Sequence, residues 1–144
     1  MGHRPGEYVY CSSHDHVYRS QSTNDAYPTA IHMGLYASHQ ALLPHLKELI
    51  AALRDKAEAF AHIVKMGRTQ LEDAVPMTLG QTFGGFASIL DNELQHLEEA
   101  AADFLTVNMG ATAIGTGICS EPGYAEKTVE ALARITGWHV VLAT

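Results

Sequence analysis

The chain has few of the features that mark secreted, nucleic-acid-binding or membrane proteins. Its two cysteines, Cys11 and Cys119, form neither a CxxC pattern nor a disulfide framework, which is typical of a reducing cytoplasm. It has no basic run and a formal net charge of −7, so nothing in it favours binding to nucleic acid. No apolar run approaches the roughly 20 residues of a membrane-spanning helix, and the polar start is no signal peptide. We expect a cytoplasmic protein that binds neither nucleic acid nor membrane.

What the chain does have is long helical periodicity. Its 144 residues, 47% of them hydrophobic, make one globular domain or a piece of one. A first helix is expected over about 29–66, with a kink at Pro44 or a start just before it. Its apolar stripe, at alternating steps of four and three, is Leu42, Leu46, Leu49, Leu53, Ala57, Phe60 and Val64.

Two further helices are expected, over about 78–105 and 122–136, the last ending at Gly137. The stripe of the second helix is Phe83, Phe86, Leu90, Leu94, Leu97, Ala101 and Phe104. Gly84 and Gly85 interrupt this helix, which suggests that another helix approaches closely there. The fold class predicted is all-α: a long antiparallel helical hairpin plus a shorter helix. One stripe per helix leaves apolar surface uncovered, so we expect the chain to self-associate into a homo-oligomer.

Two polar stretches interrupt the pattern. Residues 1–28 are expected to be irregular, ahead of a helical region over 29–144. Residues 66–76 are expected to be a polar loop between the long helices, with Gly67 ending one helix and Pro76 opening or preceding the next.

Within 1–28, Ser20–Asp25 is a run of hydrogen-bonding side chains. One interpretation is a helix cap, because Ser22 and Asp25 have the spacing of a capping box. The other is an anion site, because hydroxyls beside helix N–H groups suit a carboxylate or phosphate. The residues alone leave both open.

Other polar groups offer less. Thr69 and Gln70 can orient a substrate but are poor general bases, whereas Glu72 and Asp73 are possible acid/base groups, though loop carboxylates are usually solvated. The Gly/Thr loop over 110–117 is too short for a dinucleotide fingerprint. His14 and His16 lie two apart, but no third ligand has suitable spacing, so no metal site is predicted.

Three segments together resemble the aspartase/fumarase superfamily. They are Ser20-Gln21-Ser22-Thr23-Asn24-Asp25-Ala26-Tyr27-Pro28-Thr29-Ala30, Met66-Gly67-Arg68-Thr69-Gln70-Leu71-Glu72-Asp73-Ala74-Val75-Pro76-Met77-Thr78-Leu79-Gly80-Gln81, and Gly110-Ala111-Thr112-Ala113-Ile114-Gly115-Thr116-Gly117. Their order and spacing match the superfamily's substrate-binding segment, second signature and following loop. In this comparison Gln70 makes the chain more similar to the ammonia-lyase branch, because fumarases usually carry a histidine at this position.

The resemblance implies long helices in the bundle of a homotetramer. It implies a reaction that takes a proton from C3 of L-aspartate and expels ammonia from C2 to give fumarate, with an aci-carboxylate intermediate held by hydrogen-bond donors. Ser22, Thr23 and Asn24 would hold the substrate, an amino-acid dicarboxylate. Thr69 and Gln70 would line the same pocket from another subunit. No cofactor is implied.

The chain also departs from the family pattern. The flexible Gly-Ser-Ser loop that carries the family's general base is absent, as is an N-terminal Gly-Thr-Ser segment, so the chain resembles a central fragment, about a third of a subunit, that is inactive alone. Before the Ser22 cluster, Ser13 and His14 stand where the family usually has Pro-Asn, and Tyr18 stands for Asn. The alternatives to an ammonia-lyase are a fumarase-like hydratase and a helical oligomerisation module without activity.

Overall fold

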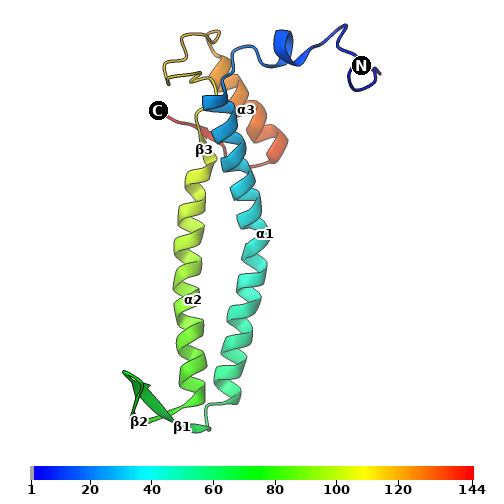
Figure 1. The fold of residues 1–144 in the computed structure, drawn as a ribbon. Coiled ribbons are helices and arrows are strands. Elements are labelled where there is room, and N and C mark those ends of the chain that lie inside the picture. Colours follow the sequence, from blue (N-terminus) through cyan, green and yellow to red (C-terminus); the bar gives the residue numbers. More distant parts are fainter. Residues whose placement is uncertain (1) are drawn as a thin grey trace. The chain divides into compact units, whose positions relative to one another are not determined.

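The computed structural model describes residues 2–144, which form two compact units. Met1 belongs to the segment expected to be irregular and lies outside the described residues. The terminal unit combines the residues up to Tyr36 with Ala102–Thr144, and the hairpin unit is Ala37–Ala101. In chain order the elements are η1 (Ser13–Val17), α1 (Thr23–Ala59), β1 (Val64–Thr69), β2 (Glu72–Thr78), α2 (Leu79–Ala102), η2 (Asp103–Leu105), β3 (Thr106–Val107), α3 (Tyr124–Thr136) and β4 (Val141–Leu142). Helices dominate, as predicted (Figure 1). None of those in residues 2–144 combines the length and apolarity needed to cross a membrane.

In the hairpin unit, α1 and α2 run antiparallel and side by side (Figure 1). Lys47 pairs with Glu98 at 3.2 Å, and about two turns further along α1 Arg54 pairs with Asp91 at 2.9 Å. Residue numbers rise along one helix as their partners' numbers fall along the other. This confirms the predicted helical hairpin.

The seam between these helices is offset from the predicted stripes. Over residues 37–60 the buried or half-buried side chains are His39, Leu43, Leu46, Ile50, Leu53, Ala57 and Phe60, the last of which follows α1. Leu42 and Leu49 are about half exposed, and so is Phe86 of α2. The reason is that apolar residues stand next to each other, as in Leu42-Leu43 and Leu49-Ile50, so two adjacent faces of α1 satisfy the same periodicity.

The closest backbone approach lies at Gly80 rather than at Gly84 and Gly85. A Cβ on Gly80 would meet the carbonyl oxygen of Ala57 and stand 2.7 Å from the Cα of Ala61. A Cβ on Gly84 would make an ordinary contact of 3.7 Å, and one on Gly85 would meet nothing within 4 Å. A glycine of the second helix does allow a close backbone contact, as expected, but that glycine is Gly80 and not Gly84 or Gly85.

The expected polar loop at 66–76 is a β-hairpin. β1 and β2 pair antiparallel, and Thr69 pairs with Glu72 around a two-residue turn. Gly67 lies in β1 and ends no helix, and Pro76 lies in β2, where it precedes α2 without opening it. The turn forms because Gln70 and Leu71 adopt positive φ of 50° and 67°, which suits a hairpin connection.

The ends of the long helices differ from the expectation. α1 begins at Thr23 instead of 29, continues through Pro44 and ends at Ala59 instead of 66. It ends there because carbonyls beyond it accept from the start of α2: the Leu79 N–H donates to the Ile63 oxygen at 2.8 Å, and the Gly80 N–H to that of Phe60 at 3.0 Å.

A reciprocal cap opens α2. The Thr78 hydroxyl accepts the Gln81 N–H at 3.1 Å, and the Gln81 side-chain oxygen accepts the Thr78 N–H at 2.8 Å. This is a capping box, so the second long helix begins one residue after the expected Thr78.

The terminal unit has its own core. The buried side chains Val107, Met109, Val129 and Val140 form it, with β3 and β4 paired in parallel beside α3. Gly137 ends α3 with a φ of 74° and donates its N–H to the Ala133 carbonyl at 2.8 Å, as predicted.

Candidate functional site

The first turn of α1 is capped by its own polar residues. The Ser22 hydroxyl oxygen accepts the Asn24 N–H at 3.1 Å, and the Asp25 carboxylate accepts the Ser22 N–H at 2.8 Å. The capping interpretation of this cluster is confirmed. It leaves the anion interpretation open, because a hydroxyl that accepts one bond can still donate its own hydrogen.

This helix starts before Pro28 because a side chain replaces the bond that Pro28 cannot make. Proline has no N–H, so the Asn24 carbonyl, four residues earlier, lacks its helical donor. The Asn108 side-chain amide donates to that carbonyl at 3.1 Å. The loop that begins at Asn108 therefore stabilises the helix start, which no local pattern indicated.

A cavity of about 540 Å³ opens beside this turn. The residues that line it are Tyr18, Gln21, Ser22, Thr23, Ala26 and Tyr27. Two of the predicted substrate-binding residues, Ser22 and Thr23, thus face one space. The lining offers hydroxyls, phenols and an amide close to the N-terminus of a long helix, a neutral donor set that suits a carboxylate.

Asn24, the third predicted residue of this cluster, is not in that lining. Its side-chain amide donates to the Ala113 carbonyl at 2.8 Å. The side-chain oxygen of Asn24 is an acceptor and its second amide N–H is a donor, so this residue can bind an amine, a hydroxyl or a carboxylate.

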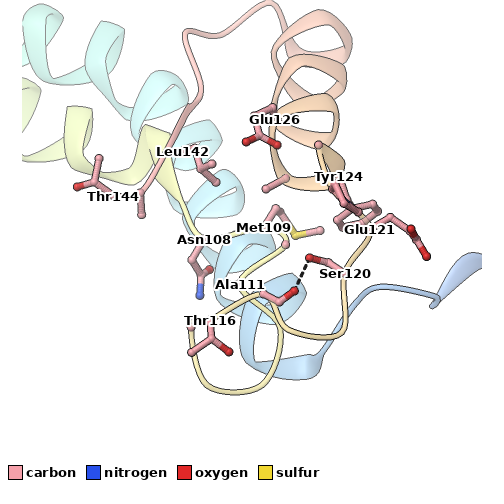
Figure 2. Close-up of a pocket in the computed structure, with 17 residues that line it drawn as sticks. Asn108, Met109, Ala111, Thr116, Ser120, Glu121, Tyr124, Glu126, Leu142 and Thr144 are labelled. Carbon is pink, nitrogen blue, oxygen red and sulfur yellow. Dashed lines mark hydrogen bonds between the residues drawn. The ribbon is translucent and has the colours of Figure 1, made fainter.

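A second cavity of about 540 Å³ lies on the Gly/Thr loop (Figure 2). Its walls are the residues 108–111, 115–117 and 120–126 together with 142–144. A dashed line in Figure 2 marks the hydrogen bond that the Ser120 hydroxyl donates to the Gly117 carbonyl at 2.8 Å. The loop was expected to be irregular, and it is; the cavity that it forms was not predicted.

Thr69 and Gln70 lie in the hairpin unit, at the turn between β1 and β2, and both are exposed. Neither of the two cavities is lined by them. Gln70 has a φ of 50°, a conformation that side chains other than glycine and asparagine rarely adopt. Strained residues of this kind concentrate at functional positions.

The remaining candidate groups have local partners. Asp73 accepts from Arg68 at 3.0 Å on the exposed face of the β-hairpin, and Glu72 is exposed. The His16 ring accepts the Ser12 N–H at 3.1 Å, and the His14 ring lies edge-on to that of Tyr18. Across residues 2–144, no three histidine, cysteine, aspartate or glutamate side chains are grouped so as to hold a metal ion.

A lyase family model matches residues 4–144. The chain belongs to this lyase family. It is 54% identical over 144 residues to the aspartate ammonia-lyase of Pseudomonas canavaninivorans, covering 99% of this chain and 30% of the relative. It is 47% identical over 143 residues to the aspartate ammonia-lyase of Escherichia coli strain K12, again covering 99% and 30%. The chain thus spans about 30% of the length of these relatives.

Solved structures of the lyase family share the fold. A fumarate lyase:delta crystallin from Brucella melitensis, bound to cobalt, matches with a TM-score of 0.92 and 45% identity over 99% of this chain and 31% of that one. The class II fumarase of Schistosoma mansoni matches with a TM-score of 0.80 and 34% identity over 89% and 27%. The resemblance seen in the three sequence segments is confirmed.

For this lyase chain, sequence reasoning missed part of the cavity lining. Gln21 and Tyr27 lie inside the segment that resembles the family's substrate-binding segment, and Tyr18 lies just before it, yet the sequence predicts a binding role for none of the three. Their positions within five residues of Ser22 were the available signal. The contact between the turn and the Gly/Thr loop had no such signal.

Proposed function

We propose that this chain forms the substrate-binding part of an ammonia-lyase that converts L-aspartate to fumarate and ammonia. The observation that carries the proposal is the cavity shared by Ser22 and Thr23 at the start of α1. It lies in a chain about half identical to proteins named aspartate ammonia-lyase. Its hydroxyl and amide groups can bind the carboxylates of a dicarboxylate substrate.

The reaction sets the demand on these residues. When a base takes the proton from C3 of L-aspartate, the electron pair moves into the adjacent carboxylate, which becomes a doubly charged aci-carboxylate. Collapse of this intermediate forms the C2–C3 double bond and expels the amine as ammonia. Preorganised donors at that carboxylate stabilise the intermediate, and the hydroxyls of Ser22 and Thr23 supply two of them.

The other predicted residues complete the proposed pocket. The Asn24 side-chain oxygen accepts from the substrate amine, while one N–H of its amide group is held by the Ala113 carbonyl. Thr69 and Gln70 contribute from another copy of the chain, in a homotetramer. The general base is none of these five residues, and the reaction as proposed needs no cofactor. We place the protein in the cytoplasm.

Two observations bear on the alternatives. A hydratase of the fumarase type is the second candidate, and the 34% identity to the Schistosoma mansoni fumarase supports it less than the 54% identity to an aspartate ammonia-lyase supports the first. Gln70, where fumarases usually have histidine, points the same way. A purely structural module would require no open hydroxyl-lined cavity at Ser22 and Thr23.

The proposal is tested in a chimera in which this chain replaces the matching segment of the Pseudomonas canavaninivorans enzyme. We expect Thr23→Ala in the chimera to lower kcat/KM for L-aspartate about 10²-fold, because loss of one donor to an oxyanion has that effect. Thr106→Ala, an exposed threonine of β3, is the matched control and should change it less than about twofold. Equal effects of both substitutions would contradict the assignment.

A further inference from the structure

We propose that Asp25 and Asn108 are positioning residues for the substrate-binding turn. Together they fasten the first turn of α1 to the loop that begins at Asn108, and so fix where the hydroxyls of Ser22 and Thr23 point. This inference rests on the proposed function, which assigns substrate binding to Ser22 and Thr23 and gives no role to the two fastening residues.

Asp25 is fully buried, with 0% of its surface exposed. One carboxylate oxygen accepts the Ser22 N–H at 2.8 Å, and the other accepts the Thr112 N–H, also at 2.8 Å, from 87 residues away. A buried carboxylate is tolerated only when hydrogen bonds replace its lost water. The cap needs only the bond to Ser22. The bond to Thr112 is additional, and it ties the cap to a distant loop.

Asn108 makes the second attachment in the same unit. Its amide group donates to the Asn24 carbonyl at 3.1 Å, and its side-chain oxygen accepts from the Thr29 hydroxyl at 3.5 Å. The Asn24 side chain completes the attachment through its bond to Ala113. Bonds on both sides of Asp25 therefore join residues 24–29 of α1 to residues 108–113.

The backbone at Thr112 shows that this attachment is under strain. Thr112 is 5% exposed and has a φ of 59°, which is unfavourable for a β-branched residue. Such a conformation persists where the surrounding bonds hold it, and the N–H of this residue is the one that Asp25 binds. The bond from Thr112 thus holds the loop against the first turn of α1 despite the local backbone strain, as expected where the position of that turn must be fixed.

The consequence for catalysis follows from the position of the turn. Ser22 and Thr23 lie immediately before Asn24 and Asp25, so releasing the turn from the loop lets both hydroxyls shift. A displacement of about 1 Å in a catalytic arrangement lowers the rate on the order of 10²-fold. Asp25 needs no contact with the substrate to have this effect.

Two measurements test the inference. In the 144-residue chain, hydrogen exchange of the Thr112 amide reports the attachment itself, and Asp25→Asn should lower its protection at least about tenfold. In the chimera described above, Asp25→Asn should raise KM for L-aspartate and lower kcat/KM by about 10²-fold. Asp103→Asn, at an exposed aspartate of the same unit, is the matched control and should change neither the protection of the Thr112 amide nor the kinetic constants.

Asn108→Ala gives an independent answer where Asp25→Asn prevents folding. It removes both bonds of Asn108 and keeps those of Asp25, so we expect a smaller rise in KM together with a lower kcat/KM, about tenfold. Asn92→Ala, at an exposed position of α2, is its control. A fall in the melting temperature with unchanged kcat and KM in the folded variants would show a structural role only and overturn the inference.

Failure of the proposed function is distinguishable from failure of this inference. An unmodified chimera that forms no fumarate from L-aspartate contradicts the function, whereas lost Thr112 protection in the Asp25→Asn chain still supports the attachment. An active chimera whose kinetics and amide protection are unaffected by Asp25→Asn contradicts the positioning role alone.

Discussion

Two residues at the tip of the β-hairpin, Gln70 and Leu71, have the positive φ that a two-residue hairpin turn demands. Most natural turns of this kind use asparagine, aspartate or glycine. Leu71 is in addition 99% exposed, an unusual place for a large apolar side chain. The two non-glycine turn residues and the exposed leucine both lower the stability of the isolated chain. The proposed role of this tip in the pocket of another copy accounts for their presence.

Replacing Leu71 with glycine should therefore stabilise the chain. The left-handed conformation costs a non-glycine residue about 1–2 kcal/mol, and the greater flexibility of glycine in the unfolded chain returns about 0.5–1 kcal/mol of this. We expect a gain of roughly 0.5–1 kcal/mol in the free energy of unfolding, measured by denaturant titration. Val75→Gly, at an extended position of the same hairpin, should instead destabilise; a loss of stability in Leu71→Gly would contradict the argument.

At the residue scale, the sequence predicted what depends on neighbouring residues. The cap of Ser22 by Asp25 and the stop at Gly137 both follow from local spacing, and both are present. The turn at Gln70 was missed because neither of its residues is a typical turn former. The hydrogen bond between Asp25 and Thr112 could not be predicted, because partners 87 residues apart leave no pattern in the sequence.

Among the elements, the contact between the end of α1 and the start of α2 depends on one glycine. The N–H groups that open α2 bond to carbonyls just after α1, which brings Gly80 against the backbone of Ala57 and Ala61. Gly80 is buried, and no side chain fits there without movement of the backbone.

Alanine at two glycines of α2 should accordingly have opposite effects. Gly80→Ala overpacks a backbone contact and should destabilise the chain by about 1–3 kcal/mol. Gly85→Ala, where a Cβ meets nothing within 4 Å, should stabilise it by roughly 0.5–1 kcal/mol through helix propensity. Thermal unfolding of both variants measures the difference, and effects of the same sign would contradict the packing described.

The elements themselves were largely predictable: periodicity indicates the two long helices, and Pro122 and Gly137 delimit the third, at lengths near those observed. Their ends were less so, because the end of α1 is set by hydrogen bonds to α2 and its start by Asn108. The buried face was ambiguous by one residue, because leucine and isoleucine occupy adjacent faces of the same helix. The β-hairpin replaced a loop that composition alone favoured.

At the scale of the whole molecule, apolar side chains remain uncovered in the hairpin unit. Leu42 and Leu49 of α1 and Phe86 and Ile89 of α2 are all about half exposed. Exposed apolar faces of this kind mark surfaces of association, and they support the proposed homo-oligomer.

A charge on this surface should dissociate the oligomer. We expect Ile89→Glu to lower the mass of the chain in solution, measured by analytical ultracentrifugation, while the helical content stays unchanged. Ile135→Glu, at an exposed position of α3, is the matched control and should leave the mass unaltered. An oligomer that survives Ile89→Glu would place the interface elsewhere.

The most direct test of the proposed ammonia-lyase function is the substrate choice of the chimera that carries this chain. Fumarate is followed by its ultraviolet absorbance, with L-aspartate in one sample and L-malate in the other. We expect fumarate from L-aspartate and none above background from L-malate, because Gln70 is the residue proposed to complete the pocket of Ser22 and Thr23. Fumarate from L-malate, or from neither substrate in a chimera that assembles correctly, would contradict the claim that this chain forms the substrate-binding part of an ammonia-lyase.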